Sequence, residues 1–328
     1  MGFTAYILTR SKKIKDLSCE FKNIEQRDVE IFISEILDKD KSFIVAHPEY
    51  RLSLFEYLKL VYFVRQKRNG HSVAAITGHK EFYGLDFFVN KNVLIPRPDT
   101  ELLVETAVES LKSPPATQDR LRALRAGKVK SPIVLIDVGT GSGCIPISIL
   151  KSLQQSDNLT IEPFATDISR SALRVAKKNA KKHGINIKFF HGNLLEPLLS
   201  VIPAKAGIQT IDGWIPGQAR NDNYIIITAN LPYLTEKQFQ DEPSIWREPK
   251  KALVAKNNGL ALYEELLTQI KSLFTIHNSL FTLLLEIDPS QSEAILKIIK
   301  QYLPNAKTET KTDLAGRDRL VIIKLSTL

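Results

Sequence analysis

The stretch that decides the fold is "VLIDVGTGSGCIPISIL", residues 134–150. An apolar, β-branched run ends at Asp137, glycines follow at alternate positions, and the chain then takes on helical spacing. A strand, a glycine-rich turn and a helix in this order start a parallel α/β sheet, and the glycines let the backbone approach a ligand closely. The glycines alone would also suit a dinucleotide. The lysine of a triphosphate-binding loop does not follow them, which argues against that ligand.

Further apolar strands alternate with helical segments along the rest of the chain. This alternation predicts an α/β fold with a doubly wound, mostly parallel sheet. In such sheets, ligands bind beyond the carboxyl ends of the strands. The predicted strands cover residues 132–139, 161–167, 187–193, 223–230, 280–287 and 317–325.

The region before the sheet divides into three parts. Residues 1–24 match no recognisable pattern, whereas residues 25–80 carry apolar residues at helical spacing and predict a small all-helical domain, with Gly70 as a helix stop. Residues 81–100 predict a β-hairpin linker in which "LDFFV" pairs with "VLI" across the turn "NKN". The α/β domain then spans 101–328, and Asp99 or Thr100 is expected to cap its first helix.

Two stretches interrupt this domain. Residues 113–131 form a long basic loop, and residues 201–223 are also long for a connection inside a compact domain. Within the second, the codons of residues 207–209, reverse-complemented in a shifted frame, can specify Trp-Ile-Pro, which is the sequence of residues 214–216. The segment resembles the mobile palindromic repeats found inside some bacterial genes. An ordinary long loop is the alternative.

Composition narrows the class of protein. A net charge of +9 over 328 residues permits a nucleic-acid partner without requiring one. Much of the charge lies in residues 174–184, which we interpret as the solvated face of a helix between Ser169 and Gly184. Two cysteines fit a reducing, cytoplasmic setting, and Cys144 is expected to pack as a small apolar residue. Neither a membrane span nor a metal site is expected.

Polar or glycine residues follow four consecutive predicted strands. Asp137 ends the first strand, and Asp167 ends the second, where it could accept both ribose hydroxyls of a nucleoside. The third strand leads to Asn193 and Leu194, which could contact the edge and the face of an adenine ring. The fourth leads into "TANLPYL", residues 228–234. Because these ends share one edge of the sheet, we predict a ligand site there.

This order resembles the class I S-adenosylmethionine-dependent methyltransferases, whose fold is a seven-stranded Rossmann-like sheet. "NLPY" is similar to the (D/N)-P-P-Y motif of enzymes that methylate planar exocyclic nitrogens. Such a nitrogen is a poor nucleophile because its lone pair is delocalised. The Asn230 side-chain oxygen and the Leu231 carbonyl can each accept one N–H, which aims the lone pair at the methyl group, and Tyr233 can stack on the flat group.

Two substrates compete. One alternative is an adenine N6-methyltransferase acting on rRNA or DNA. "NLPY" is also like the motif of the rRNA adenine dimethyltransferases, but in those enzymes the helical domain follows the catalytic one. The linker at residues 74–105 and the blocks at 248–267, 283–291 and 312–324 resemble the release-factor glutamine methyltransferases (the PrmC/HemK family). That resemblance implies methylation of the glutamine N5 in the Gly-Gly-Gln motif of class I peptide chain release factors.

The same resemblance assigns site residues. S-adenosyl-L-methionine would contact Asp137, Gly139, Thr140, Gly141, Ser142, Gly143, Asp167, Asn193, Leu194 and Asn230. The glutamine would lie against the catalytic residues Asn230, Leu231, Pro232 and Tyr233.

Three features complicate the resemblance. Leu231 replaces the first proline of the motif and loses its fixed φ, so we expect a looser pocket. "AKNNG", residues 255–259, replaces a turn richer in glycine and acid. The insertion at 201–223 precedes the strand at 223–230 and could perturb the site. Leu231 and this insertion leave open a degenerate paralogue that binds the cofactor without methylating. Arg97, between two prolines, either braces the linker against the next helix or covers the mouth of the site.

Overall fold

The computed structural model describes residues 12–21, 24–113, 133–154, 159–199, 224–276 and 280–326. The chain forms two compact units, one of Met1–His79 with Pro243–Arg247 and one of Lys80–Glu242 with Glu248–Leu328. Apart from Ser113, the two long loops predicted at 113–131 and 201–223 lie outside the described residues. No described helix is both long and apolar enough to cross a membrane.

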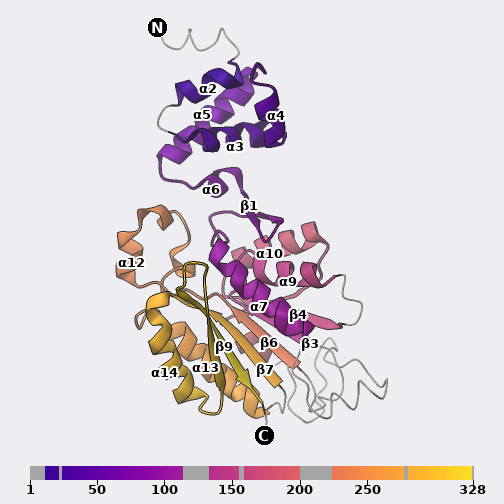
Figure 1. Ribbon diagram of the computed structural model, residues 1–328, viewed down its shortest axis with the longest axis vertical. Coiled ribbons are helices and arrows are strands. Elements are labelled where there is room, and N and C mark those ends of the chain that lie inside the picture. Colours follow the sequence, from indigo (N-terminus) through magenta and orange to yellow (C-terminus); the bar gives the residue numbers. More distant parts are fainter. Residues whose placement is uncertain are drawn as a thin grey trace. The chain divides into compact units, whose positions relative to one another are not determined.

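The first unit is helical (Figure 1). Its core joins buried residues of α3 and α5, such as Phe32 and Leu60, to Ile14, Leu17 and Phe21. Helix α2 therefore lies within the segment that carried no recognisable pattern. The helices are α2 (Ile14–Glu20), α3 (Gln26–Leu37), α4 (Lys41–Ala46), α5 (Leu54–Arg68) and α6 (Val73–Thr77).

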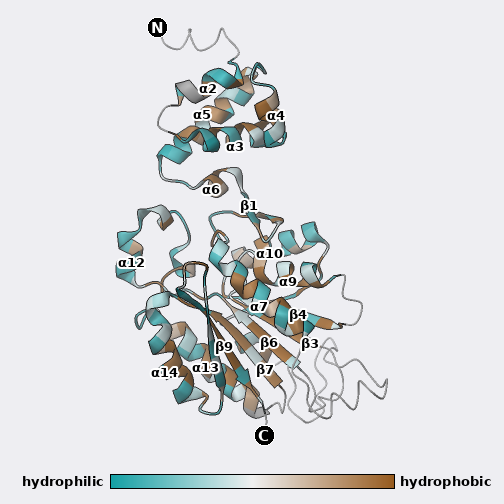
Figure 2. Cartoon of the chain, in the orientation of Figure 1, coloured by the Kyte–Doolittle hydropathy of each residue, from teal (hydrophilic) through white to brown (hydrophobic). Residues whose placement is uncertain are grey.

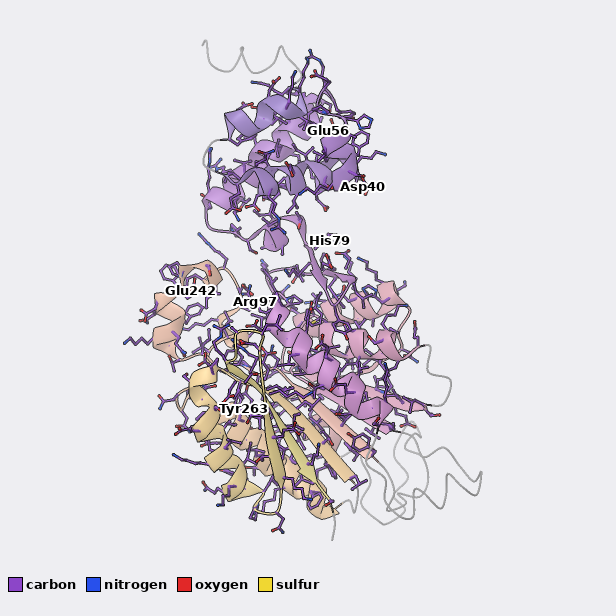
Figure 3. All side chains as sticks on the ribbon, in the orientation of Figure 1. Asp40, Glu56, His79, Arg97, Glu242 and Tyr263 are labelled. Atoms are coloured by element: carbon purple, nitrogen blue, oxygen red, sulfur yellow. The ribbon has the colours of Figure 1, made fainter. Side chains whose placement is uncertain are left out.

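Local sequence sets the helix ends of this unit. The Asp40 side chain accepts a hydrogen bond from the Phe43 amide and caps α4. Ser53 and Glu56 form a reciprocal capping box at the start of α5 (Asp40 and Glu56 in Figure 3). Helix α5 ends at Arg68, and Gly70 follows in the left-handed region at φ +85°, as its predicted role as a helix stop requires.

The second unit is built on a seven-stranded sheet with strand order β5-β4-β3-β6-β7-β9-β8. Strands β3 to β7 are parallel, and β9 runs antiparallel to both β7 and β8. This arrangement confirms the predicted doubly wound, mostly parallel fold. The strands are β3 (Ile133–Val138), β4 (Ile161–Asp167), β5 (Lys188–His191), β6 (Tyr224–Ala229), β7 (Leu280–Glu286), β8 (Lys307–Thr312) and β9 (Asp318–Leu325).

Helices cover both faces because the inner strands are apolar on both sides (Figure 2). One core contains residues of α7 (Glu101–Lys112), α9 (Cys144–Leu153) and α10 (Arg170–His183). The opposite core contains residues of α13 (Ala261–Ile276) and α14 (Ser292–Tyr302). The remaining short helices are α11 (Glu196–Leu199), α12 (Glu236–Asp241), η1 (Pro98–Thr100), η2 (Pro243–Ile245), η3 (Lys250–Ala252) and η4 (Pro289–Gln291).

Strand β8 was not among the strands located from the sequence. Its residues, "KTETKT", are exposed or half-buried and show no apolar face. It pairs with β9 at one edge of the sheet, so the ladder of backbone hydrogen bonds holds it in place without side-chain burial.

The linker contains a hairpin, and its predicted strand "LDFFV" is observed as β2, but the predicted partner strand and turn are wrong. The observed ribbon pairs β1 (His79–Phe82) with β2 (Leu85–Phe88) across Tyr83 and Gly84, whose φ values of 53° and 69° suit a two-residue hairpin turn. "VLI" forms no strand because the Ile95 amide donates instead to the Glu248 carboxylate, at 3.0 Å.

The predicted cap of α7 is also wrong. A 3₁₀ turn, η1, precedes the helix, and Thr100 has helical dihedrals and makes no capping hydrogen bond. Its hydroxyl is engaged elsewhere, by the side chain of Asn230. Asp99 lies 3.2 Å from Arg319 of β9, in an ion pair that holds η1 beside the sheet.

Candidate cofactor and substrate site

The loop after β3 is shaped by its glycines. Gly139, Gly141 and Gly143 have φ values of 71°, 56° and 80°, in the left-handed region that residues with a Cβ rarely adopt. A Cβ on Gly143 would lie 3.1 to 3.3 Å from atoms of Ile147 and Ala176, so the third glycine brings the start of α9 against α10. The loop between β3 and α9 is therefore a tight backbone cradle, as the sequence predicted.

Asp137 does not point into open space. Its carboxylate is fully buried and accepts a hydrogen bond from the Thr228 hydroxyl of the neighbouring strand, at 2.7 Å. Burial raises the pKa of Asp137 to about 7, although hydrogen bonds from Thr140 and Thr228 oppose the shift. This hydrogen bond ties the glycine loop (residues 139–143) to β6, so Asp137 is placed to hold the loop. A contact of Asp137 with the cofactor stays a prediction.

Asp167 fixes the other side of the loop. One of its carboxylate oxygens accepts the Gly141 amide at 2.9 Å, and the other accepts the Ser169 amide at 2.7 Å. Burial raises its pKa, and these two backbone hydrogen bonds lower it in part. Each oxygen retains a lone pair, so the carboxylate can still accept hydroxyl groups.

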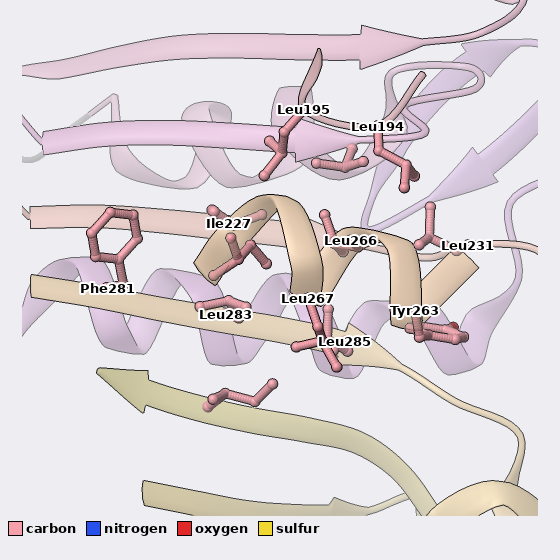
Figure 4. Packing of buried hydrophobic residues seen from close by; sticks show 14 of the residues in the cluster. Leu194, Leu195, Ile227, Leu231, Tyr263, Leu266, Leu267, Phe281, Leu283 and Leu285 are labelled. Atoms are coloured by element: carbon pink, nitrogen blue, oxygen red, sulfur yellow. The ribbon is translucent and has the colours of Figure 1, made fainter. Parts of the chain in front are cut away.

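Asn193 and Leu194 follow β5. Leu194 has a φ of 47° and is buried in the core beside α13, while the Asn193 amide donates to the Glu265 carboxylate. Figure 4 shows Leu194 grouped with Leu231 and Tyr263 towards the carboxyl ends of the strands. Leu194 can therefore bound a pocket at this edge, while Asn193 already has a partner.

Asn230 is the first residue after β6 and lies at the same edge of the sheet as the glycine loop. Its side-chain nitrogen donates to the Thr100 hydroxyl at 3.1 Å. Thr100 is 2% exposed, so this contact is sheltered from water. With its nitrogen bonded to Thr100, the amide has its oxygen left for another partner.

Leu231 is tightly held despite the lost proline. Leu231 is 3% exposed. A Cβ added to Gly139 would lie 3.2 Å from Leu231 Cδ2, so Leu231 packs directly against the glycine loop. Tyr263, in the same core, donates its hydroxyl to the Glu286 carbonyl. The side chain of Leu231 is thus closely packed, and the expectation of a looser substrate pocket stays a prediction.

The backbone after the motif is held by a second segment. Leu234 forms an isolated bridge with Val254, and the Gln291 side chain donates to the Tyr233 carbonyl at 2.8 Å. Asn257 and Asn258 have φ values of 52° and 51°. Asparagine tolerates this left-handed conformation better than most residues, so "AKNNG" makes a turn that a glycine-rich sequence would make.

A buried acid stands behind the motif. Glu286 ends β7, is 1% exposed, and accepts the Tyr233 hydroxyl at a long distance of 3.5 Å. Burial raises the pKa of Glu286 to about 7, while the Thr100 hydroxyl and the positive charge of Arg319 lower it. The pKa of Tyr233 is raised as well, mainly by burial.

Arg97 braces the linker, but not against the following helix. Its guanidinium pairs with Glu248, the same carboxylate that accepts the Ile95 amide (Arg97 in Figure 3). The "IPRP" linker is thus fastened to the segment that leads into η3. This contact accounts for Arg97 without a role at the mouth of the site.

The basic stretch at 174–184 forms the outer face of α10, which begins after Ser169 and ends before Gly184, as predicted. Its lysines are exposed, and two of them have local partners: Lys182 pairs with Asp86, and Lys178 lies 3.3 Å from the centre of the Phe88 ring. The solvated interpretation of this face therefore fits. Cys144 is buried, and burial raises the pKa of its thiol to about 12. The uncharged thiol thus packs as a small apolar group, as predicted.

Asn179 is a connection that the sequence analysis missed. Although it lies on the basic helix, it is fully buried. Its amide nitrogen donates to the carbonyls of Phe88 and Ser142 at 2.9 and 2.8 Å, and its oxygen accepts the Phe88 amide at 2.8 Å. One side chain thus links the ribbon to the glycine loop. The signal was its position on the apolar face of α10, between Ala176 and Ala180.

Replacing Asn179 by alanine is expected to lower the free energy of unfolding by about 2–4 kcal/mol, because three backbone groups lose a partner. Asn186→Ala, at an exposed asparagine beyond the same helix, is the matched control and should change it by about 0.5 kcal/mol or less. Urea denaturation of both variants measures the difference. Equal small effects would mean that water replaces the Asn179 contacts.

Two more residues near the site, Thr100 and Glu286, were not predicted to belong to it. Glu286 carried a signal, because it ends the otherwise apolar strand "LFTLLLEI" at the edge where ligands bind. Thr100 carried none, because its position before α7 made it an ordinary capping candidate.

The whole chain is similar to known methyltransferases. The sequence profile of the methyltransferase small domain matches residues 121–201. A release factor glutamine methyltransferase of Enterococcus faecalis is 32% identical over 86% of this chain and 86% of its own length. Another, from Dictyoglomus turgidum, is 30% identical over 95% of this chain and 94% of its own.

A solved structure, a release factor-specific protein-(glutamine-N5) methyltransferase from Alicyclobacillus acidocaldarius, is 20% identical over 71% of this chain and 95% of that one. Its TM-score of 0.34 is too low to support an argument, so the relationship rests on the sequence relatives. Since these span nearly the full chain at 30% identity or more, the chain belongs to the release factor glutamine methyltransferase family.

Proposed function

We propose that this protein transfers a methyl group from S-adenosylmethionine to the side-chain nitrogen of the glutamine in the Gly-Gly-Gln motif of class I peptide chain release factors. The observation that carries the proposal is the placement of Asn230. Its amide nitrogen is engaged by Thr100, at the strand edge where Leu231 packs on the glycine loop. Family membership supports the same reaction.

The chain's residues fit the cofactor. The left-handed glycines of residues 139–143 form a cradle that Cβ atoms would crowd, and Asp167 offers carboxylate lone pairs beside it. We assign the nucleoside to Asp167 and Leu194, and the methionine portion to the glycine loop. When bound, S-adenosylmethionine supplies an electrophilic methyl group on a positively charged sulfur. Asp137 serves by holding the loop on β6.

The protein's part in the reaction is positioning. The Asn230 oxygen and the Leu231 carbonyl each accept one N–H of the glutamine amide, which turns the nitrogen lone pair towards the methyl group. Tyr233 provides a flat surface for the amide. A strong general base is not required, because methyl transfer neutralises the sulfonium and the amide proton can leave to solvent afterwards. Fixed dipoles of this kind cost no reorganisation as the charge moves.

The helical unit is proposed to recognise the protein substrate. Helix α5 is apolar on both sides: Leu60 and Val64 are buried, while Phe55 is 87% exposed and Tyr62 is 57% exposed. Exposed aromatic residues in a small domain are typical of protein-binding surfaces. The substrate and the cysteine usage favour a cytoplasmic location.

The decisive experiment offers labelled S-adenosylmethionine and two substrates to the purified protein. One is a full-length class I release factor, compared with its variant in which the Gly-Gly-Gln glutamine is alanine, and the other is unmodified ribosomal RNA. We expect label only on the unaltered factor. Label on RNA would move the assignment to adenine methylation, and cofactor binding without any label would identify a degenerate paralogue.

A further inference from the structure

The two polar residues of the NLPY motif converge on one buried acid. Asn230 donates to Thr100. The Thr100 hydroxyl is near enough to lower the pKa of Glu286, although the described structure forms no hydrogen bond between these two side chains. Tyr233 points its hydroxyl at Glu286 Oε1. Among the described residues, Glu286 Oε2 completes no hydrogen bond of good geometry, so the carboxylate retains unused capacity to accept one.

The number of protons in this chain fixes the direction of its hydrogen bonds. A carboxylate only accepts, so a Thr100 hydroxyl that turns towards Glu286 gives its single proton to that carboxylate. The Thr100 oxygen can then only accept from Asn230, which presents its NH2 group to Thr100. The Asn230 oxygen then faces away from Thr100 and is left for the acceptor role that the proposed function needs.

We propose that Thr100 and Glu286 are positioning residues that lock the side-chain amide of Asn230 with its oxygen facing the substrate. This inference rests on the proposed function, since the reversed amide would place one NH2 group against another. A protonated Glu286 could instead donate to Thr100, which would release the Thr100 proton towards Asn230 and permit the reversed amide.

Several charged or titratable groups face Glu286 and set when it ionises. Arg319 on β9 favours the carboxylate, while burial and the Asp99 charge on η1 oppose it. The net effect is a pKa of about 7. Glu286 is thus ionised above that pH, and turnover should rise as the pH increases from about 6 to 8. The other groups near it are Tyr233, Tyr263, Cys144 and Asp288.

Three threonine variants test the lock. Thr100→Val removes the hydroxyl at nearly constant shape, whereas Thr100→Ser keeps it. Thr106→Val is the control, because it makes the same change at a buried threonine on α7. The Thr106 hydroxyl has no hydrogen-bond partner within the described structure. We expect Thr100→Val to lower kcat about tenfold or more with KM for the release factor within about threefold, and to lose the rise with pH. Thr100→Ser and Thr106→Val should stay within about threefold of the unaltered protein.

An unchanged kcat in Thr100→Val would overturn the proposal. So would a Thr100→Ser variant as slow as Thr100→Val, because the methyl group and not the hydroxyl would then matter. A pH rise that survives in Thr100→Val would likewise exclude Glu286 as its source through this route.

A second measurement needs no substrate and separates this inference from the proposed function. The side-chain ¹⁵NH₂ signal of Asn230 is identified by its absence in Asn230→Ala. It should shift with pH near 7 in the unaltered protein and not in Thr100→Val. If no substrate is labelled but this shift is present, the proposed function is wrong and the positioning of Asn230 by Thr100 and Glu286 is supported. If the release factor is labelled but the shift is absent, the function is supported and the positioning is wrong.

Discussion

Asn230→Ala is expected to reduce turnover on the release factor by about a hundredfold or more while leaving the affinity for S-adenosylmethionine within several-fold. The alanine removes one of two acceptors for the glutamine N–H groups, a contact that matters most in the transition state. The remaining cradle, with Asp167 bonded to the glycine loop, is untouched. Single-turnover rates with labelled cofactor, together with calorimetric binding, measure the two quantities separately.

Asn193→Ala is the comparison variant, since it removes an amide that follows another strand of the sheet, β5, and is already bonded to Glu265. It should affect turnover far less than Asn230→Ala. Near-normal turnover in Asn230→Ala would refute the role assigned to this side chain. A parallel loss of cofactor affinity would instead mean that Asn230 chiefly holds the cofactor.

Gly259→Ala is expected to destabilise the second unit by roughly 3–5 kcal/mol and to impair turnover. A Cβ there would lie 1.9 Å from the Tyr233 carbonyl oxygen and 2.3 Å from the Gln291 side-chain nitrogen. The first contact is with backbone, so the end of the NLPY motif would have to move. The glycine also has a φ of 83°, which strains any residue with a Cβ.

Gly316→Ala separates the two causes. Gly316 has a similar φ of 75°, but nothing lies within 4 Å of its missing Cβ. It should cost only the conformational strain, about 1–2 kcal/mol. Urea denaturation of both variants gives the comparison, and equal losses would show that the turn around Gly259 relaxes without disturbing Tyr233.

The parallel strands could be predicted because their side chains report their burial. Strand β6 was expected at 223–230 and is observed at Tyr224–Ala229, and the strand-edge rule placed Asp167 and Asn230 at one end of the sheet. Strand β8 could not be located in this way. Its "KTETKT" sequence has no buried face, and only its pairing with β9 defines it.

The errors arose where distant residues decide local structure. The turn "NKN" has turn chemistry as good as that of Tyr83-Gly84, but Glu248 takes the Ile95 amide from 153 residues away and so excludes a strand there. Thr100 was expected to cap α7, yet its hydroxyl serves Asn230, 130 residues further along. Patterns within a short stretch of sequence do not reveal contacts between residues so far apart in the chain.

The two outer strands of the sheet have a consequence for how the protein behaves at high concentration. An apolar sheet with an open edge is a template on which other chains can add strands and polymerise. One outer strand here, β5, is only four residues long, and the other, β8, carries Lys307, Glu309 and Lys311. An incoming strand would have to desolvate these charges along its whole length. The charged, exposed side chains that kept β8 from being predicted as a strand thus protect the folded protein from edge-to-edge aggregation.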